Sequence, residues 1–344
     1  MELTPRKQAV LKAVVKAYIE TGEPVGSKIL TELLENAPSS ATLRNEMSEL
    51  CDLGLLQQPH TSAGRIPTAG GFKVYVDTLM PNVEVSHDTA VFLDNALKEI
   101  NCEPEGIPAV AAKALSKLTG LPAIACLITD RPPTIKRIEL LSIGRFSLML
   151  LIITDDGRAR NRILRIPKDF TAEAQECFNR ISECRIKGKT VEMLTRGYMQ
   201  SVIAETGIYA LELMPIFTAI FETAAEIEEK SVHLSGENAL YNICGDEQSA
   251  ARIMSLIKSR DPFVAMLEKI GDGAGAVFGK DTGYRELWQD TIIAAKFSGA
   301  DKYKGYVGVI GPTRMSYEQI MPATRYTAKK LTTIMTEAQK DMED

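Results

Sequence analysis

The N-terminal part of the chain carries apolar residues at helical spacing, separated by short breaks rich in glycine, proline and polar residues. A first helix is expected from Pro5, because Thr4 supplies an N-terminal cap and proline at the first helical position costs no hydrogen bond. Residues 21–24, Thr-Gly-Glu-Pro, are typical of a helix end. The predicted helix has one apolar stripe: Val10, Leu11, Val14, Val15, Tyr18 and Ile19.

Two shorter helices are expected next. The second begins near Ser27, and the third is capped by Ser39 or Ser40 and ends at Gly54, a residue suited to a helix C-terminus. Each has apolar positions that are expected to face a core: Ile29, Leu30, Leu33 and Leu34 in the second, and Leu43, Met47 and Leu50 in the third.

A small hairpin is predicted after the third helix. Residues 55–58 have the pattern of a strand, residues 59–64 are rich in turn formers, and a return strand begins at Arg65. Three helices followed by a hairpin are typical of a winged helix-turn-helix, which we expect over residues 1–78.

The remainder of the chain predicts a multidomain α+β organisation. Residues 79–106 are expected to be a linker with one helix. Residues 171–233 have almost no strand signal and are expected to form an inserted helical domain. The flanking parts, residues 107–170 and 234–344, are expected to form one α+β domain. Its predicted elements are a helix near 110–118, strands at 122–128, 135–143, 146–153, 159–166, 291–297 and 306–310, and a closing helix from Ser316.

Composition narrows the possible functions. The 344 residues are 45% hydrophobic and 25% charged, as in a folded globular protein. A formal net charge of −5 excludes a uniformly basic coat but allows a local basic surface, and 6% aromatic residues disfavour a stacking platform for single strands. The charged start of the chain lacks the apolar core of a secretion signal, and the cysteines form no CxxC pair, so a cytoplasmic protein is expected.

The third helix is the expected DNA reader, because the second helix of a helix-turn-helix motif places its N-terminal residues against base edges. The candidates are Ser40, Thr42, Arg44 and Asn45. Arginine can bind guanine or phosphate, asparagine can pair with adenine, and threonine offers a hydroxyl and a methyl group. The alternative is that Ser40 only caps the helix, while Arg44 and Asn45 lie on a solvated face.

The segment after the third helix is free of acidic side chains. From Leu53 to Val76 there are 24 residues without Asp or Glu, where about 3 are expected from the 45 acidic residues in 344. This segment also contains Thr68 and Lys73. A polyanion requires such a surface, with cations and hydrogen-bond donors that reach phosphate. The candidate wing contacts are His60, Thr61, Ser62 and Arg65; the alternative is an ordinary polar hairpin.

The sequence contains no convincing catalytic or metal-binding motif. Residues 271–276 resemble a phosphate loop only superficially and are expected to be a flexible loop. The three histidines are isolated, and no HExxH or G-x-S-x-G sequence occurs. Asp155 and Asp156 are expected in a hairpin turn. We therefore expect no enzyme, no metal and no cofactor.

Two motifs near opposite ends of the chain resemble the heat-inducible transcription repressor family HrcA. The N-terminal part contains LTPR at residues 3–6, YIETGEPVGS at 18–27 and QPHTSAGRIPT at 58–68. Near the other end, GVIGPTRM at residues 308–315 is followed by Tyr317. Because these motifs occur in the family's order, the resemblance covers essentially the whole chain.

The resemblance implies a function and an architecture. It implies a repressor of chaperone and chaperonin operons that prevents heat-shock induction at normal temperature. Such repressors bind an inverted-repeat operator called CIRCE as homodimers, with chaperonin as a modulator. It further implies that the α+β domain is GAF-like and that the inserted domain forms the dimer.

Three other classes of function stay open at this stage. One is a ligand-responsive winged-helix regulator with a small molecule bound in the GAF-like domain, for which a pocket with converging polar groups is the discriminating feature. Another is an enzyme with a nucleic-acid-binding module, and the third is a scaffold whose winged helix binds protein.

Overall fold

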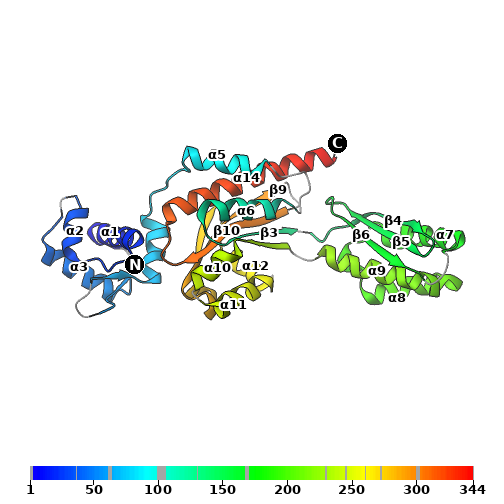
Figure 1. Ribbon diagram of the computed structural model, residues 1–344, viewed down its shortest axis with the longest axis horizontal. Helices are drawn as coiled ribbons and strands as arrows, with labels where there is room; N and C mark the ends of the chain where they lie inside the picture. Colours follow the sequence, from blue (N-terminus) through cyan, green and yellow to red (C-terminus); the bar gives the residue numbers. More distant parts are fainter. Residues whose placement is uncertain are drawn as a thin grey trace.

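The protein, described here by a computed structural model, consists of three units arranged in line (Figure 1). We call them the N-terminal unit (residues 3–79), the central unit (residues 87–129 and 231–343) and the distal unit (residues 131–228). The residues that the structure describes are 3–35, 37–60, 64–98, 106–129, 131–166, 170–228, 231–244, 246–259, 261–271, 273–299 and 303–343.

The N-terminal unit has the predicted three helices and hairpin. Thr4 caps the first helix as expected, its hydroxyl accepting a hydrogen bond from the Lys7 amide (3.3 Å). A helical segment after the hairpin, which the sequence reasoning did not predict, completes the unit. The elements are α1 (Pro5–Thr21), α2 (Ser27–Leu33), α3 (Ser40–Asp52), β1 (Leu56–Gln57), β2 (Ile66–Pro67), α4 (Ala69–Val74) and a π-helical turn η1 (Tyr75–Leu79).

The short helix α2 differs from the expectation. Ile29 and Leu33, predicted to be buried, are 46% and 53% exposed, and Leu30 is the residue of this helix that enters the core. A helix of seven residues makes two turns, so only a narrow part of its surface faces α1 and α3.

The central unit is built on a five-stranded antiparallel sheet with the order β7-β3-β10-β9-β8. Strands β3, β9 and β10 were predicted, whereas β7 and β8 were not. The expected loop at residues 271–276 is wrong in its second half, because residues 274–276 pair with β9. The strands are β3 (Ala123–Thr129), β7 (Ser231–Ser235), β8 (Ala274–Phe278), β9 (Asp290–Gly299) and β10 (Tyr303–Pro312).

Helices cover both faces of this sheet (Figure 1). Alternate residues of β10 enter different cores: Val307 and Val309 pack on one face, Tyr306 and Ile310 on the other. One face carries α5 (His87–Leu97), α6 (Ile107–Thr119) and α14 (Tyr317–Glu343). The other carries α10 (Glu237–Cys244), α11 (Glu247–Lys258) and α12 (Asp261–Leu267), and the turns α13 (Gly279–Thr282) and η5 (Arg285–Leu287) precede β9.

The distal unit corrects the expected place of three strands. Residues 135–165 were assigned to the same domain as β3, but they form a separate antiparallel sheet with the order β4-β5-β6. The reason is that β5 buries Leu148, Leu150 and Ile152 against Phe178 and Phe217 of the helices that follow. The insertion therefore begins well before residue 171 and is itself α+β.

The distal sheet is covered by three helices and some shorter turns, which lie in the region predicted to be helical. The elements are β4 (Ile135–Gly144), β5 (Ser147–Thr154), β6 (Ala159–Arg165), α7 (Ala172–Ile181), η2 (Ser182–Ile186), η3 (Val191–Met193), α8 (Arg196–Glu205), η4 (Gly207–Tyr209) and α9 (Ala210–Glu228). At the junction with the central unit, the Tyr303 hydroxyl donates to the Asp156 carbonyl (2.5 Å).

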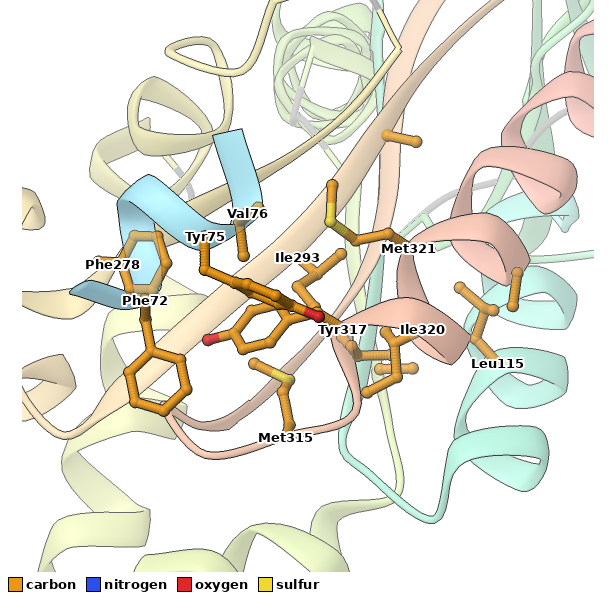
Figure 2. Close-up of a cluster of buried hydrophobic side chains, with 14 of the residues drawn as sticks. Phe72, Tyr75, Val76, Leu115, Phe278, Ile293, Met315, Tyr317, Ile320 and Met321 are labelled. Atoms are coloured by element: carbon orange, nitrogen blue, oxygen red, sulfur yellow. The ribbon is translucent and has the colours of Figure 1, made fainter. Parts of the chain in front are cut away.

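An aromatic cluster joins the N-terminal and central units in one hydrophobic core (Figure 2). The ring of Phe72 on α4 lies 6.0 Å from that of Tyr317 at the start of α14, and Tyr317 lies 6.3 Å from Phe278 of β8. Tyr317 and Tyr75 are both fully buried. Because both units contribute to this cluster, neither can move away from the other without exposing it to water.

Ion pairs surround the aromatic cluster. The Tyr75 hydroxyl donates to Glu318 (2.6 Å), which also pairs with Lys16 of α1 (2.8 Å), and Lys73 pairs with Asp281 (2.7 Å). Burial and the Glu318 carboxylate both raise the pKa of Tyr75. Burial alone would raise the pKa of Glu318, but the hydrogen bonds from Lys16 and Tyr75 hold it below its ordinary value. These polar contacts fix the position of the N-terminal unit relative to the central unit.

The two sequence motifs also meet at this junction. Gly22 ends α1 in the left-handed conformation (φ 74°). A Cβ atom at this position would lie 2.3 Å from Nη1 of Arg314, so glycine leaves the space that the guanidinium occupies. The N-terminal Thr-Gly-Glu-Pro turn and the Gly-Pro-Thr-Arg segment therefore form one contact between the units.

Replacing Phe72 by Ala is expected to destabilise both units together. Phe72 is 3% exposed, and truncating a buried Phe to Ala costs about 3–5 kcal/mol of unfolding free energy. Chemical denaturation of the full chain measures this loss, and the matched control is Phe146→Ala, whose ring is 46% exposed in the distal unit. Equal losses in the two variants would contradict the role given to the cluster.

Candidate nucleic-acid interface

The third helix is held by its own cap and by a contact with α2. Ser39 is the N-cap: its hydroxyl accepts a hydrogen bond from the Thr42 amide (3.2 Å) and lies 3.0 Å from the Thr42 hydroxyl. The Ser40 hydroxyl pairs with that of Ser27 at the start of α2 (2.8 Å). These contacts set the angle between the two helices, while the buried face of α3 packs into the core through Leu43, Met47 and Leu50.

The four predicted reading residues of α3 divide into two pairs. Arg44 and Asn45 are exposed and project from the helix away from its core. Ser40 and Thr42 are half-buried and already engaged at the helix start. The helix thus offers one cation and one amide to a partner, and both groups have the hydrogen-bonding capacity that base edges require.

Two acidic residues of α3, Glu46 and Glu49, pair with cations of α1. Glu46 lies 3.7 Å from Arg6 and 3.5 Å from Lys7, and Lys7 also pairs with Glu49 (2.8 Å). The hydrogen bond to Glu49 raises the pKa of Lys7, so this lysine stays charged at every physiological pH. A duplex that approaches Arg44 therefore meets carboxylates that already have cationic partners.

The hairpin is tied to the turn between α1 and α2. The Arg65 amide donates to the Val25 carbonyl (2.8 Å), and the Val25 amide donates back to the Arg65 carbonyl (2.9 Å). Gly64 makes this approach possible, because a Cβ atom there would lie 2.4 Å from the Val25 carbonyl oxygen. Arg65 is consequently held at a fixed backbone position with its side chain half-buried.

The remaining predicted wing residues have mixed outcomes. His60 is exposed, whereas Thr61 and Ser62 lie outside the described residues. Two other polar residues of the acid-free segment serve the fold instead. Thr68 caps α4 and donates to the Gly54 carbonyl (2.6 Å), and Lys73 is paired with Asp281 of the central unit.

Sequence reasoning missed the segment that anchors this interface. Phe72, Tyr75 and Val76 recur at spacings of three and four, which is the signal of a helix with one apolar face. The structure confirms that α4 and η1 bury these residues against α14 and β8 (Figure 2). Helix α3 and the hairpin are thereby attached to the central sheet.

Comparison with known proteins identifies the chain as a transcription repressor. Residues 107–321 match the family model described as the HrcA protein C-terminal domain. The heat-inducible transcription repressor HrcA of Clostridium tetani (strain Massachusetts / E88) is 32% identical, with 93% of this chain and 92% of that protein covered. The HrcA repressor of Caldanaerobacter subterraneus subsp. tengcongensis is 28% identical, with 99% of each chain covered.

More particularly, the chain belongs to the HrcA family of heat-inducible transcription repressors, which are not enzymes. The family resemblance seen in the sequence is thus confirmed, together with its assignment to heat-shock regulation. A solved crystal structure of a hypothetical protein has the same fold: its TM-score is 0.66 at 23% identity, with 98% of this chain and 100% of that chain covered.

Replacing Gly64 by Ala is expected to detach the hairpin from α1. The clash with the Val25 carbonyl breaks two backbone hydrogen bonds, worth about 1–3 kcal/mol together. The control is Gly70→Ala, where the new methyl group meets ordinary contacts of 3.5 Å or more and helix α4 gains up to about 1 kcal/mol. Urea denaturation distinguishes the two, and a neutral Gly64→Ala variant would contradict the anchoring.

Proposed function

We propose that the protein is a cytoplasmic homodimer that represses chaperone and chaperonin operons by binding an inverted-repeat, CIRCE-type operator at normal temperature. The observation that carries this proposal is the arrangement of α3: Arg44 and Asn45 point outward, while Glu46 and Glu49 pair with α1. Such a helix can read double-stranded DNA, because the major groove admits a helix and presents distinct donors and acceptors.

In this proposal the N-terminal unit acts as a winged helix-turn-helix. Arg44 and Asn45 read base edges, and Thr42 and Ser40 contact the duplex at the helix start after small changes of rotamer. His60, Thr61, Ser62 and Arg65 of the wing hold the phosphate backbone beside the groove. The central unit is the GAF-like domain, and the distal unit is the insertion that forms the dimer.

Exposed apolar residues support the distal unit as the dimer contact. Ile208 of η4 is 90% exposed and Leu211, three residues later in the first turn of α9, is 83% exposed. The segment Gly207–Ile227 has a mean hydropathy of 1.4, long and apolar enough to cross a membrane, yet Ile216, Phe217 and Ile220 are buried in the distal core. A helix that is buried in the core over most of its length and has exposed apolar residues at its start is better suited to a protein–protein contact than to crossing a membrane.

The heat response needs no separate sensor in this proposal. A protein loses stability steeply near its unfolding midpoint, so modest warming empties the operator if the junction around Tyr317 is marginal. A chaperonin that refolds the repressor then acts as its modulator, because an occupied chaperonin leaves more repressor inactive. Operator affinity with and without chaperonin measures this step.

Replacements of Asn45 and Arg65 are expected to affect binding differently. Asn45→Ala should reduce discrimination between bases by about 1–3 kcal/mol at particular operator positions. Arg65→Ala should weaken binding to all duplexes and lower the slope of affinity against salt by about 1. Fluorescence anisotropy with an inverted-repeat chaperone promoter and a scrambled duplex, each at several salt concentrations, measures both effects.

Two controls accompany this experiment. Asn95→Ala on α5 and Arg137→Ala in the distal unit remove the same groups far from the proposed interface and should leave affinity unchanged. Identical effects of Asn45→Ala and Arg65→Ala would refute the division between base and phosphate contacts. Equal affinity of the unaltered protein for both duplexes would refute operator recognition itself.

Leu211→Glu is expected to separate the dimer. A carboxylate at the centre of an apolar contact must be buried without a partner, which opposes association. Sedimentation velocity should show a shift to the monomer, with operator affinity falling because one chain reaches a single half-site. Met193→Glu, also at an exposed apolar position of the distal unit, is the matched control. A dimer that survives Leu211→Glu unchanged excludes this surface.

A further inference from the structure

The central unit contains a polar cavity that the proposed function does not use. Its volume is about 670 Å³, and it lies beside the first residue of β9, where the end of α10, the start of α11 and the turn η5 meet. This is the sheet face covered by α10–α12, opposite the face that carries the aromatic cluster. The volume is in the range of small-molecule sites.

Asp290 is a buried acid on the wall of this cavity. It is 7% exposed and shares its sheet face with Ile292 and Ala294, which pack against α10–α12. Among the described residues, its carboxylate has no hydrogen-bond or ion-pair partner. Burial raises its pKa to about 6, so it is ionised at neutral pH. A buried carboxylate is costly without donors, which makes a ligand with N–H groups the natural complement.

The lining of the cavity also includes a flat ring and two cations. Trp288, which follows η5, is 49% exposed, and the Arg285 guanidinium lies 5.7 Å from its ring centre. Arg252 of α11 is exposed and donates to the Ser249 hydroxyl (3.1 Å). An exposed indole binds planar rings by stacking, and guanidinium groups bind phosphate.

We propose that this cavity binds a guanine nucleotide. Guanine presents two adjacent N–H donors on one edge, which a single carboxylate, here Asp290, accepts together. Its planar ring stacks on Trp288, and its phosphate pairs with Arg252 and Arg285. Adenine is disfavoured, because its corresponding edge places a ring-nitrogen acceptor against the carboxylate. The proposal is independent of operator binding and is tested without DNA.

The chain itself supplies the probe for the test. Trp288 is the one tryptophan of the sequence, so tryptophan fluorescence reports on this cavity alone. Titration of the full-length protein with guanosine 5′-monophosphate at pH 7.5 should give a saturable change. Adenosine 5′-monophosphate and guanosine should each need at least tenfold higher concentrations, and inorganic phosphate alone should give no change. Absence of a response to guanosine 5′-monophosphate at 5 mM, or an equal response to both nucleotides, overturns the proposal.

Variants test the individual contacts by calorimetric titration with guanosine 5′-monophosphate. Asp290→Asn should lose at least tenfold in affinity and most of the preference over adenosine 5′-monophosphate, because an amide both donates and accepts. Trp288→Ala should lose at least fivefold. The control is Asp88→Asn, the same change at an exposed position of α5, and this variant should bind normally. Thermal melts establish that each variant is folded, and unchanged binding by a folded Asp290→Asn variant overturns the assignment.

The dependence on pH gives a further readout. The charged and titratable groups around Asp290 are Cys244 of α10, Asp246 at the N-cap of α11, Arg252 of α11, and Arg285 and Glu286 of η5. Burial and the nearby acids raise the pKa of Cys244, so its thiol is neutral at these pH values. Protonation of Asp290 below its pKa of about 6 removes an acceptor. Affinity should therefore fall severalfold between pH 7.5 and pH 5 in the unaltered protein; an affinity that stays constant over this range contradicts the role of Asp290.

Discussion

The position of α3, the proposed reading helix, depends on the tilted ring contact between Phe72 and Tyr317. This contact joins α4, which directly follows the hairpin, to α14, which lies along the central sheet. Phe72 and Tyr75 of the N-terminal unit are buried in one hydrophobic core with Tyr317 and Phe278 of the central unit, so this core contributes both to the stability of the N-terminal unit and to its placement. A dimer formed through the distal unit would therefore present its two reading helices at a spacing set by three packed units rather than by flexible linkers.

Local pairing of charges explains how a chain with a net charge of −5 presents a surface to a polyanion. Glu46 and Glu49 form ion pairs with Lys7 within the N-terminal unit, and Glu318 binds Lys16 and Tyr75 at the junction. These acidic side chains thus stabilise the packing of helices, while Arg44 remains exposed on the outer face of α3. Local arrangement, more than total charge, determines the field that a duplex meets.

Local signals predicted the N-terminal unit well, because caps, helical spacing and turn formers act over a few residues. Thr4, Ser39 and the hairpin at residues 56–67 are where these signals placed them. Contacts between residues that are distant in sequence could not be predicted from such local signals. Lys73 was counted among cations available to DNA, but Asp281, 208 residues away, is its partner.

The wider topology was harder to predict for a similar reason. Alternating apolar residues identified strands at residues 135–165, yet nothing in that pattern says which sheet a strand joins. The short strands β7 and β8 lie at the sheet edges and carry a weak pattern of their own. The proposed DNA contacts fall between these cases. Arg44 and Asn45 are exposed, in agreement with their pattern. Ser40 is paired with Ser27 of α2, a contact that helix packing supplies, and Thr42 is paired with Ser39, the cap of its own helix.

The coupling of the reading helix to the central unit is tested most directly by amide hydrogen exchange. The full-length protein is followed from growth temperature to heat-shock temperature, in parallel with release of the operator. A single shared core predicts that amides of α3 and α14 lose protection together, at the temperature where DNA is released. Release of the operator while both helices remain fully protected would contradict this account.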